Sequence, residues 1–129
     1  MIRIGLDFHG VIDTHPKTFS DLSNRVISKG GEIHIITGAH IDSGFREHLI
    51  KLGIRWTHMY SITDYHLSMK TPMTFDDTGN PWIDKETWDR SKGDYCRVKG
   101  VDLHIDDSDI YGNYFDTPYI KIGEYVKNI

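Results

Sequence analysis

The stretch Gly5-Leu6-Asp7-Phe8-His9-Gly10-Val11 decides how this sequence is interpreted. It closes an apolar run over residues 2–8, which is typical of a buried strand in a parallel sheet. Gly10 and Pro16 then interrupt the pattern and predict a loop over residues 9–17. A carboxylate therefore stands where a buried strand ends, at the edge where open α/β sheets bind their ligands.

Strands and helices alternate along the rest of the chain. This order predicts an α/β fold with a Rossmann-like parallel sheet and helices on both faces, in a single domain over residues 1–129. Asp77-Thr78-Gly79-Asn80-Pro81 predicts the tip of a hairpin within a short insertion around residues 63–83. The remaining strands are expected at 32–36, 56–62, 101–105 and 118–122, and the helices at 18–29, 42–52, 84–98 and 108–115.

Composition narrows the class of protein. With 38% apolar and 26% charged residues, the 129-residue chain has the profile of a soluble globular domain, and no stretch suits a membrane span. Arg3 and Asp7 interrupt the first apolar run, which argues against a signal peptide. The lone Cys96 excludes an internal disulfide and favours a cytoplasmic location. A net charge of −4 gives no basic footprint for nucleic acid.

Polar groups recur at predicted strand and helix ends. Asp7 has the position of a carboxylate that attacks phosphorus, and Asp106-Asp107 offer oxygen ligands for Mg²⁺. Thr37-Gly38 offers a hydroxyl and backbone N–H groups to a phosphate, although a plain N-cap is the alternative. Lys92, on a predicted helix, would neutralise charge on the nucleophile and on the transferring phosphoryl group.

In this order, Asp7, Thr37, Lys92 and Asp106-Asp107 resemble the four motifs of the haloacid dehalogenase superfamily, over residues 4–107. Ile105-Asp106-Asp107-Ser108 is similar to the acidic motif of its deoxyribonucleotidase and polynucleotide 3′-phosphatase branches. The resemblance implies a phosphatase with a small cap or none.

The resemblance also implies roles for individual residues. Asp7 would be the nucleophile, and Thr37, Gly38 and Lys92 would bind the phosphate. Mg²⁺ would be held by Asp7, the main-chain carbonyl of His9 and Asp106. Asp107 would support these ligands from behind or reach the ion through water.

The function that these roles imply is Mg²⁺-dependent hydrolysis of a phosphate monoester through an aspartyl-phosphate intermediate. The expected partner is a phosphorylated small molecule or a nucleotide, and a nucleic-acid end is also compatible. Without a full lid the site would be open, or a neighbouring subunit of a homo-oligomer would cover it. A receiver-type phospho-acceptor domain is disfavoured, because receivers carry the acidic pair early in the chain and here it comes last.

His9 departs from the superfamily pattern, which usually has a second Asp at this position. Three alternatives follow. His9 carries out the acid/base work, for which its unperturbed pKa of about 6.5 is suited; the protein binds phosphates without turnover; or it runs different chemistry.

The other histidines and the aromatic residues favour ordinary roles. None of the eight histidines has structural-zinc spacing. His34 and His104 lie within predicted strands and are expected to be sheet residues, whereas His15 and His40 are expected to border the site. A last group of side chains either packs on the core or stacks on a nucleobase: Tyr65, Trp82 and Trp88.

Overall fold

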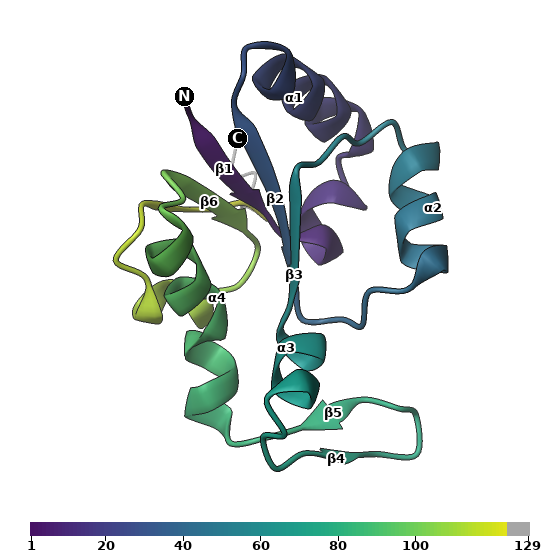
Figure 1. Ribbon diagram of the computed structural model, residues 1–129, viewed down its shortest axis with the longest axis vertical. Helices are drawn as coiled ribbons and strands as arrows, with labels where there is room; N and C mark the ends of the chain where they lie inside the picture. Colours follow the sequence, from purple (N-terminus) through teal and green to yellow (C-terminus); the bar gives the residue numbers. More distant parts are fainter. Residues whose placement is uncertain (124–129) are drawn as a thin grey trace, which may run out of the picture.

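A parallel sheet of five strands forms the centre of the computed structural model, which describes residues 1–123. The strand order is β3-β2-β1-β6-β7, and every neighbouring pair is parallel (Figure 1). This sheet, flanked by helices, confirms the predicted Rossmann-like α/β fold. The strands are β1 (Arg3–Leu6), β2 (Glu32–Thr37), β3 (His58–Ser61), β6 (Leu103–Asp106) and β7 (Tyr119–Lys121).

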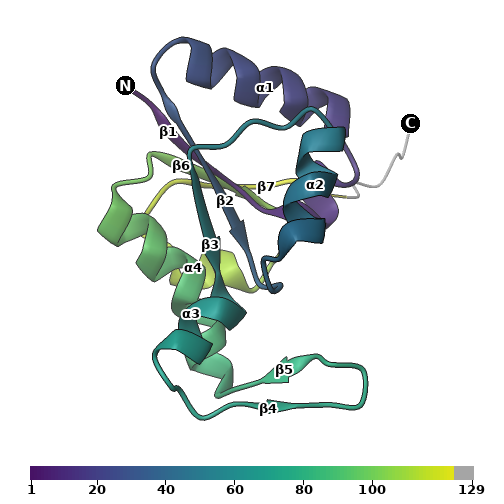
Figure 2. The ribbon, with the colours of Figure 1, turned by 45° about the vertical axis from the view of Figure 1, so that its right-hand side comes forward.

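Helices cover both faces of the sheet. Figures 1 and 2 show α1 and α2 on one side and α4 on the other. None of the described helices is both long enough and apolar enough to span a membrane. The helices are α1 (Pro16–Ser28), α2 (Ser43–Lys51), α3 (Ile62–Ser68) and α4 (Lys85–Lys99), with short turns at η1 (Phe8–Ile12) and η2 (Tyr111–Tyr114).

Strand β2 contributes to two separate apolar cores. Ile33 and Ile35 belong to the larger core, under α1 and α2, whereas Ile36 packs with Cys96 and Val101 under α4. Both faces of the strand are therefore buried, which is why apolar residues occupy both faces and only His34 interrupts the run from Ile33 to Ile36.

One local prediction was wrong, and one helix was missed. Residues 9–17 are not all loop, because Phe8–Ile12 forms a helical turn that is broken at His9 and at Gly10, whose φ is 81°. The strand expected at 56–62 ends at Ser61, whose hydroxyl accepts the N–H of Asp64 and so starts α3. The insertion therefore opens with a helix. Its hairpin is confined to β4 (Thr74–Phe75) and β5 (Pro81–Trp82).

The order of the strands reverses beside β1. The chain fills one side with β2 and β3 and then crosses over to add β6 and β7 on the other side. The carboxyl ends of β1 and β6 flank this switch point, where open α/β sheets bind ligands. The Asp7 N–H donates to the Ile105 carbonyl at 3.0 Å, so the two strand ends remain paired up to the site.

Candidate functional site

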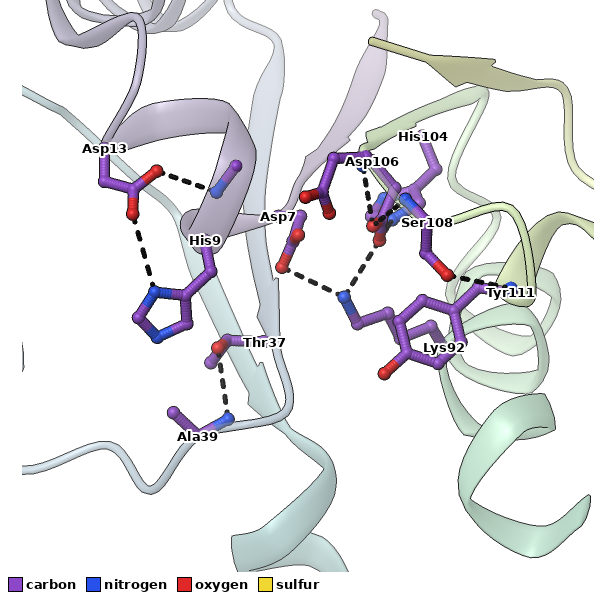
Figure 3. A network of polar contacts seen from close by, with 12 residues as sticks. Asp7, His9, Asp13, Thr37, Ala39, Lys92, His104, Asp106, Ser108 and Tyr111 are labelled. Atoms are coloured by element: carbon purple, nitrogen blue, oxygen red, sulfur yellow. Dashed lines mark hydrogen bonds and ion pairs between the residues drawn. The ribbon is translucent and has the colours of Figure 1, made fainter. Parts of the chain in front are cut away.

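A buried ammonium joins two buried carboxylates at the switch point. The Lys92 Nζ, from α4, donates to Asp7 Oδ1 at 3.0 Å and to Asp106 Oδ2 at 2.8 Å (Figure 3). Lys92, Asp7 and Asp106 are only 2%, 5% and 0% exposed. Nζ also lies 4.6 Å from the centre of the Tyr111 ring, whose π face attracts a cation. The two carboxylates therefore hold a fixed positive charge between them at the end of the sheet.

The carboxylate of Asp106 is fully engaged. Its Oδ2 accepts from Lys92 and, at 2.9 Å, from His104 Nε2, while Oδ1 accepts the N–H groups of Asp107 and Ser108 at 2.8 and 3.2 Å. Although burial alone would raise it, the hydrogen bond from His104 and the charge of Lys92 hold the pKa of Asp106 below its usual range. These bonds occupy the acceptor sites of both oxygens. Direct binding of a metal ion by Asp106 would therefore cost an existing bond.

Asp107 is better placed to contact a cation. It lines the cleft above Lys92, and Asp7, Asp106 and Asp107 each offer an oxygen within 4.8 Å of the others. A Cβ at Gly10 would overlap the Asp107 carboxylate, so this carboxylate packs against the Gly10 backbone. Carboxylate and carbonyl oxygens suit Mg²⁺. Asp7 and Asp107 therefore each have an oxygen open to a cation in the cleft, whereas both oxygens of Asp106 already accept hydrogen bonds.

Burial and the neighbouring charges together set the protonation of Asp7 and Lys92. It raises the pKa of Asp7 to about 7; the charge of Lys92 opposes this shift and that of Asp106 adds to it. A divalent cation beside Asp7 would favour the ionised, nucleophilic form. Burial disfavours the Lys92 ammonium, but the charges of Asp7 and Asp106 outweigh this effect and raise its pKa. Lys92 therefore acts as a permanent charge and not as a proton donor.

A cleft of about 430 Å³ opens over this network. Asn80 and Pro81 of the hairpin and Trp88 of α4 form part of its wall. Asp106 lies beneath the cleft, and neither His15 nor His40 lines it. The predicted site residues that do line it are Asp7, His9, Thr37, Gly38, Lys92 and Asp107.

The Thr37-Gly38 junction forms one wall of the cleft. Thr37 Oγ1 accepts the N–H of Ala39 at 3.2 Å, and the Gly38 carbonyl accepts the Thr63 hydroxyl at 2.6 Å. A Cβ at Gly38 would come within 2.8 Å of the Trp88 ring, so only glycine lets this loop approach α4 so closely. The Gly38 N–H donates to no acceptor within residues 1–123.

His9 lies across the cleft from Lys92 (Figure 3). Its side chain is 69% exposed, and Nδ1 lies 3.5 Å from Asp13 Oδ2. The second oxygen of Asp13 accepts the Gly10 N–H at 2.7 Å. Asp13 therefore holds the turn at Gly10 and also contacts the His9 imidazole.

Several contributors to the site were missed in the sequence. His104 was expected to be a sheet histidine; it is fully buried in β6, but it also donates to Asp106. Its place two residues before Asp106, on the same face of a strand, was a usable signal. Asp13 stands four residues after His9, which is also a helical spacing. Nothing in the sequence pointed to Tyr111, because only the packing of η2 against α4 brings it over Lys92.

Comparisons with protein-family models, curated proteins and solved structures found no match to this chain.

Proposed function

We propose that this protein is a Mg²⁺-dependent phosphate monoester hydrolase of the haloacid dehalogenase type, with Asp7 as the nucleophile. The observation that carries the proposal is the pairing of Asp7 with the buried Lys92 ammonium at the sheet's switch point, under a cleft that Asp107 also lines. A carboxylate, a fixed cation and a set of hard oxygen donors are what nucleophilic attack on a phosphate monoester requires.

The reaction would proceed in two displacements. An Asp7 oxygen bonds to phosphorus and the ester P–O bond breaks, while the leaving oxygen takes a proton from an acid in the cleft, for which His9 is the candidate. Water then attacks the phosphorus, the bond to Asp7 breaks, His9 takes the proton of the water, and phosphate leaves. Thr37 and the Gly38 N–H hold the phosphoryl oxygens. Mg²⁺ bound by Asp7, Asp107 and the His9 carbonyl would supply charge neutralisation.

The test uses a panel of phosphate monoesters with Mg²⁺, and it measures released phosphate for the native protein and for Asp7→Asn and His9→Asp. We expect Asp7→Asn to lower kcat by about 10³-fold or more, as loss of a nucleophile does, and His9→Asp to preserve or raise activity. A base-labile phosphoryl adduct on the native protein, absent from Asp7→Asn, would support the covalent step. Unchanged hydrolysis by Asp7→Asn would contradict the nucleophile assignment.

A phosphate-binding protein without turnover is the second candidate. It is motivated by the exposed imidazole of His9 at the position where a carboxylic acid is expected. Hydrolysis by His9→Asp but not by the native protein would favour this candidate over the enzyme. Failure of both forms would leave a receiver-type or non-phosphate chemistry.

We favour a nucleotide or a nucleic-acid end as the substrate, because the indole of Trp88 forms part of the cleft wall and offers a surface for stacking. The lone Cys96, buried as a free thiol, is consistent with a reducing, cytoplasmic setting.

A further inference from the structure

A second cluster of metal-ligating side chains lies away from the cleft, at the opposite end of the strands. Glu32 opens β2 and His58 opens β3, and His34 pairs in register with His58. Thr37, at the site end of β2, stands three residues after His34, or about 10 Å along a strand. The cluster is therefore separate from the Asp7 site.

Two imidazoles and a carboxylate converge in this cluster. His34 Nε2 lies 2.8 Å from Glu32 Oε1, His58 Nδ1 lies 4.0 Å from the same oxygen, and one ligand atom from each residue falls within 4.8 Å of the others. Donors around a tetrahedral zinc ion, with bonds of roughly 2.0–2.1 Å, stand about 3.3 Å apart. The two measured separations fall on either side of this value, so small side-chain rotations bring the donors into range.

The surroundings of His34 suit a metal ligand. Its Nδ1 bonds the Tyr95 hydroxyl at 2.7 Å, which leaves Nε2 directed at Glu32. A hydrogen bond at the second ring nitrogen is the usual way in which proteins orient a metal-binding histidine.

The His58 and Glu32 side chains lie on the solvent-exposed side of the cluster. His58 stacks on His34 with ring centres 4.2 Å apart and is 44% exposed. Its Nδ1 also bonds Thr57 Oγ1 at 2.8 Å, so a metal ion at this nitrogen would replace that bond. Arg3 Nε also contacts Glu32 Oε1, at 3.2 Å, and competes for that oxygen. Glu32 Oε2 accepts no hydrogen bond within the described residues, so it remains available.

We infer that Glu32, His34 and His58 form a binding site for a borderline divalent cation such as Zn²⁺, which joins β2 to β3 and keeps an outer position for water. Mixed imidazole and carboxylate ligands favour Zn²⁺, Co²⁺ or Ni²⁺ over Mg²⁺. The inference does not depend on the proposed function, because none of these residues lines the cleft.

Titration of the metal-free full chain with Zn²⁺ in excess Mg²⁺ tests the site, by equilibrium dialysis and by thermal unfolding. We expect one Zn²⁺ bound per chain and a raised Tm, because a ligand that binds only the folded state stabilises it. His58→Ala and Glu32→Gln should each weaken Zn²⁺ binding by about tenfold or more. Both residues are partly exposed, so these variants should fold.

Two controls separate the alternatives. His15→Ala removes an exposed histidine outside the cluster and should leave Zn²⁺ binding unchanged. The double variant Asp7→Asn/Asp107→Asn should also retain the Zn²⁺ site. The inference is overturned if no Zn²⁺ binds, if binding survives both His58→Ala and Glu32→Gln, or if it disappears only in the double aspartate variant.

Discussion

Adjacent residues of identical chemistry have different roles at the end of β6. Asp106 is fully buried and accepts from Lys92 and His104, whereas the Asp107 side chain lines the cleft. The strand's alternation turns the Asp106 side chain inward, and the break that follows lets the Asp107 side chain face the cleft. Two separate substitutions can therefore test folding and cation binding independently.

We expect Asp106→Asn to lower the free energy of unfolding by about 1–3 kcal/mol, because the amide nitrogen that replaces one oxygen cannot accept and leaves buried donors without their partner. Asp107→Asn, the matched control, should change it by about 0.5 kcal/mol or less but should raise the Mg²⁺ concentration needed for half-maximal hydrolysis. Urea unfolding and Mg²⁺ titration of activity measure the two effects. Equal stability losses, or a Mg²⁺ effect confined to Asp106→Asn, would contradict these roles.

Gly10 is constrained both by its backbone and by its neighbour. Its φ of 81° disfavours any side chain, and a Cβ would overlap the Asp107 carboxylate. Gly10→Ala should lose about 1–3 kcal/mol of stability from backbone strain and, by displacing Asp107, should also weaken Mg²⁺ activation. Gly30→Ala is the control, because its φ is 84° with open space around it. An equal Mg²⁺ response in the two variants would rule out the proposed packing of Asp107 on Gly10.

At the scale of elements, the sequence predicted the strands better than the insertion. A run such as Glu32–Thr37, buried on both faces, leaves little alternative to a central strand. Residues 62–68 begin with the β-branched pair Ile62-Thr63, which favours a strand locally. The Ser61 cap and the burial of His66 against α4 override that preference, and neither is visible as a periodic pattern.

The contact between α3 and α4 should make stability depend on pH. His66 is buried, with Nε2 3.0 Å from Ser91 Oγ and Nδ1 2.9 Å from Thr71 Oγ1. Ser91 already donates to the Thr87 carbonyl at 2.6 Å, so its oxygen accepts from His66 and the neutral ring satisfies both contacts. Burial lowers the pKa of His66 in the folded state. The neutral ring therefore contributes stability above the unfolded pKa, about 6.5, and this contribution falls as the pH drops through the lower folded pKa.

Urea unfolding at about pH 7.5 and about pH 5.5, on either side of the unfolded histidine pKa, measures this dependence. We expect the native protein to lose more stability between these conditions than His66→Gln, whose amide keeps hydrogen-bonding capacity without titrating. His34 and His104 contribute to both proteins alike, because burial lowers their pKa values too. An equal loss of unfolding free energy between the two pH values in both proteins would show that His66 is not a source of the pH dependence.

At the scale of the molecule, the predicted site assembled because parallel strands end together. Asp7, Thr37 and Asp106 were placed at strand ends by their apolar runs, and one sheet edge brings them together. The strand order could not be deduced from the sequence, because no local sequence pattern indicates that the chain crosses from β3 to β6 on the far side of β1. The same limit hid the second cluster, whose members become neighbours only through the pairing of β2 with β3.

Replacing the β4–β5 hairpin separates the residues that react from those that only form the cleft wall. Figure 2 shows it projecting below the sheet, and Phe75 and Trp82 are 50% and 63% exposed, so it contributes little to either core. Its Asn80 and Pro81 nevertheless form part of the cleft wall.

Replacing residues 74–82 with Gly-Ser-Gly should therefore change the free energy of unfolding by about 1 kcal/mol or less. It should lower kcat/KM for nucleotides more than for glycerol 2-phosphate, because the reacting residues stay in place and only the wall is lost. Unfolding of this variant, or equal losses on both substrates, would show that the hairpin supports the whole site and not the far part of the substrate.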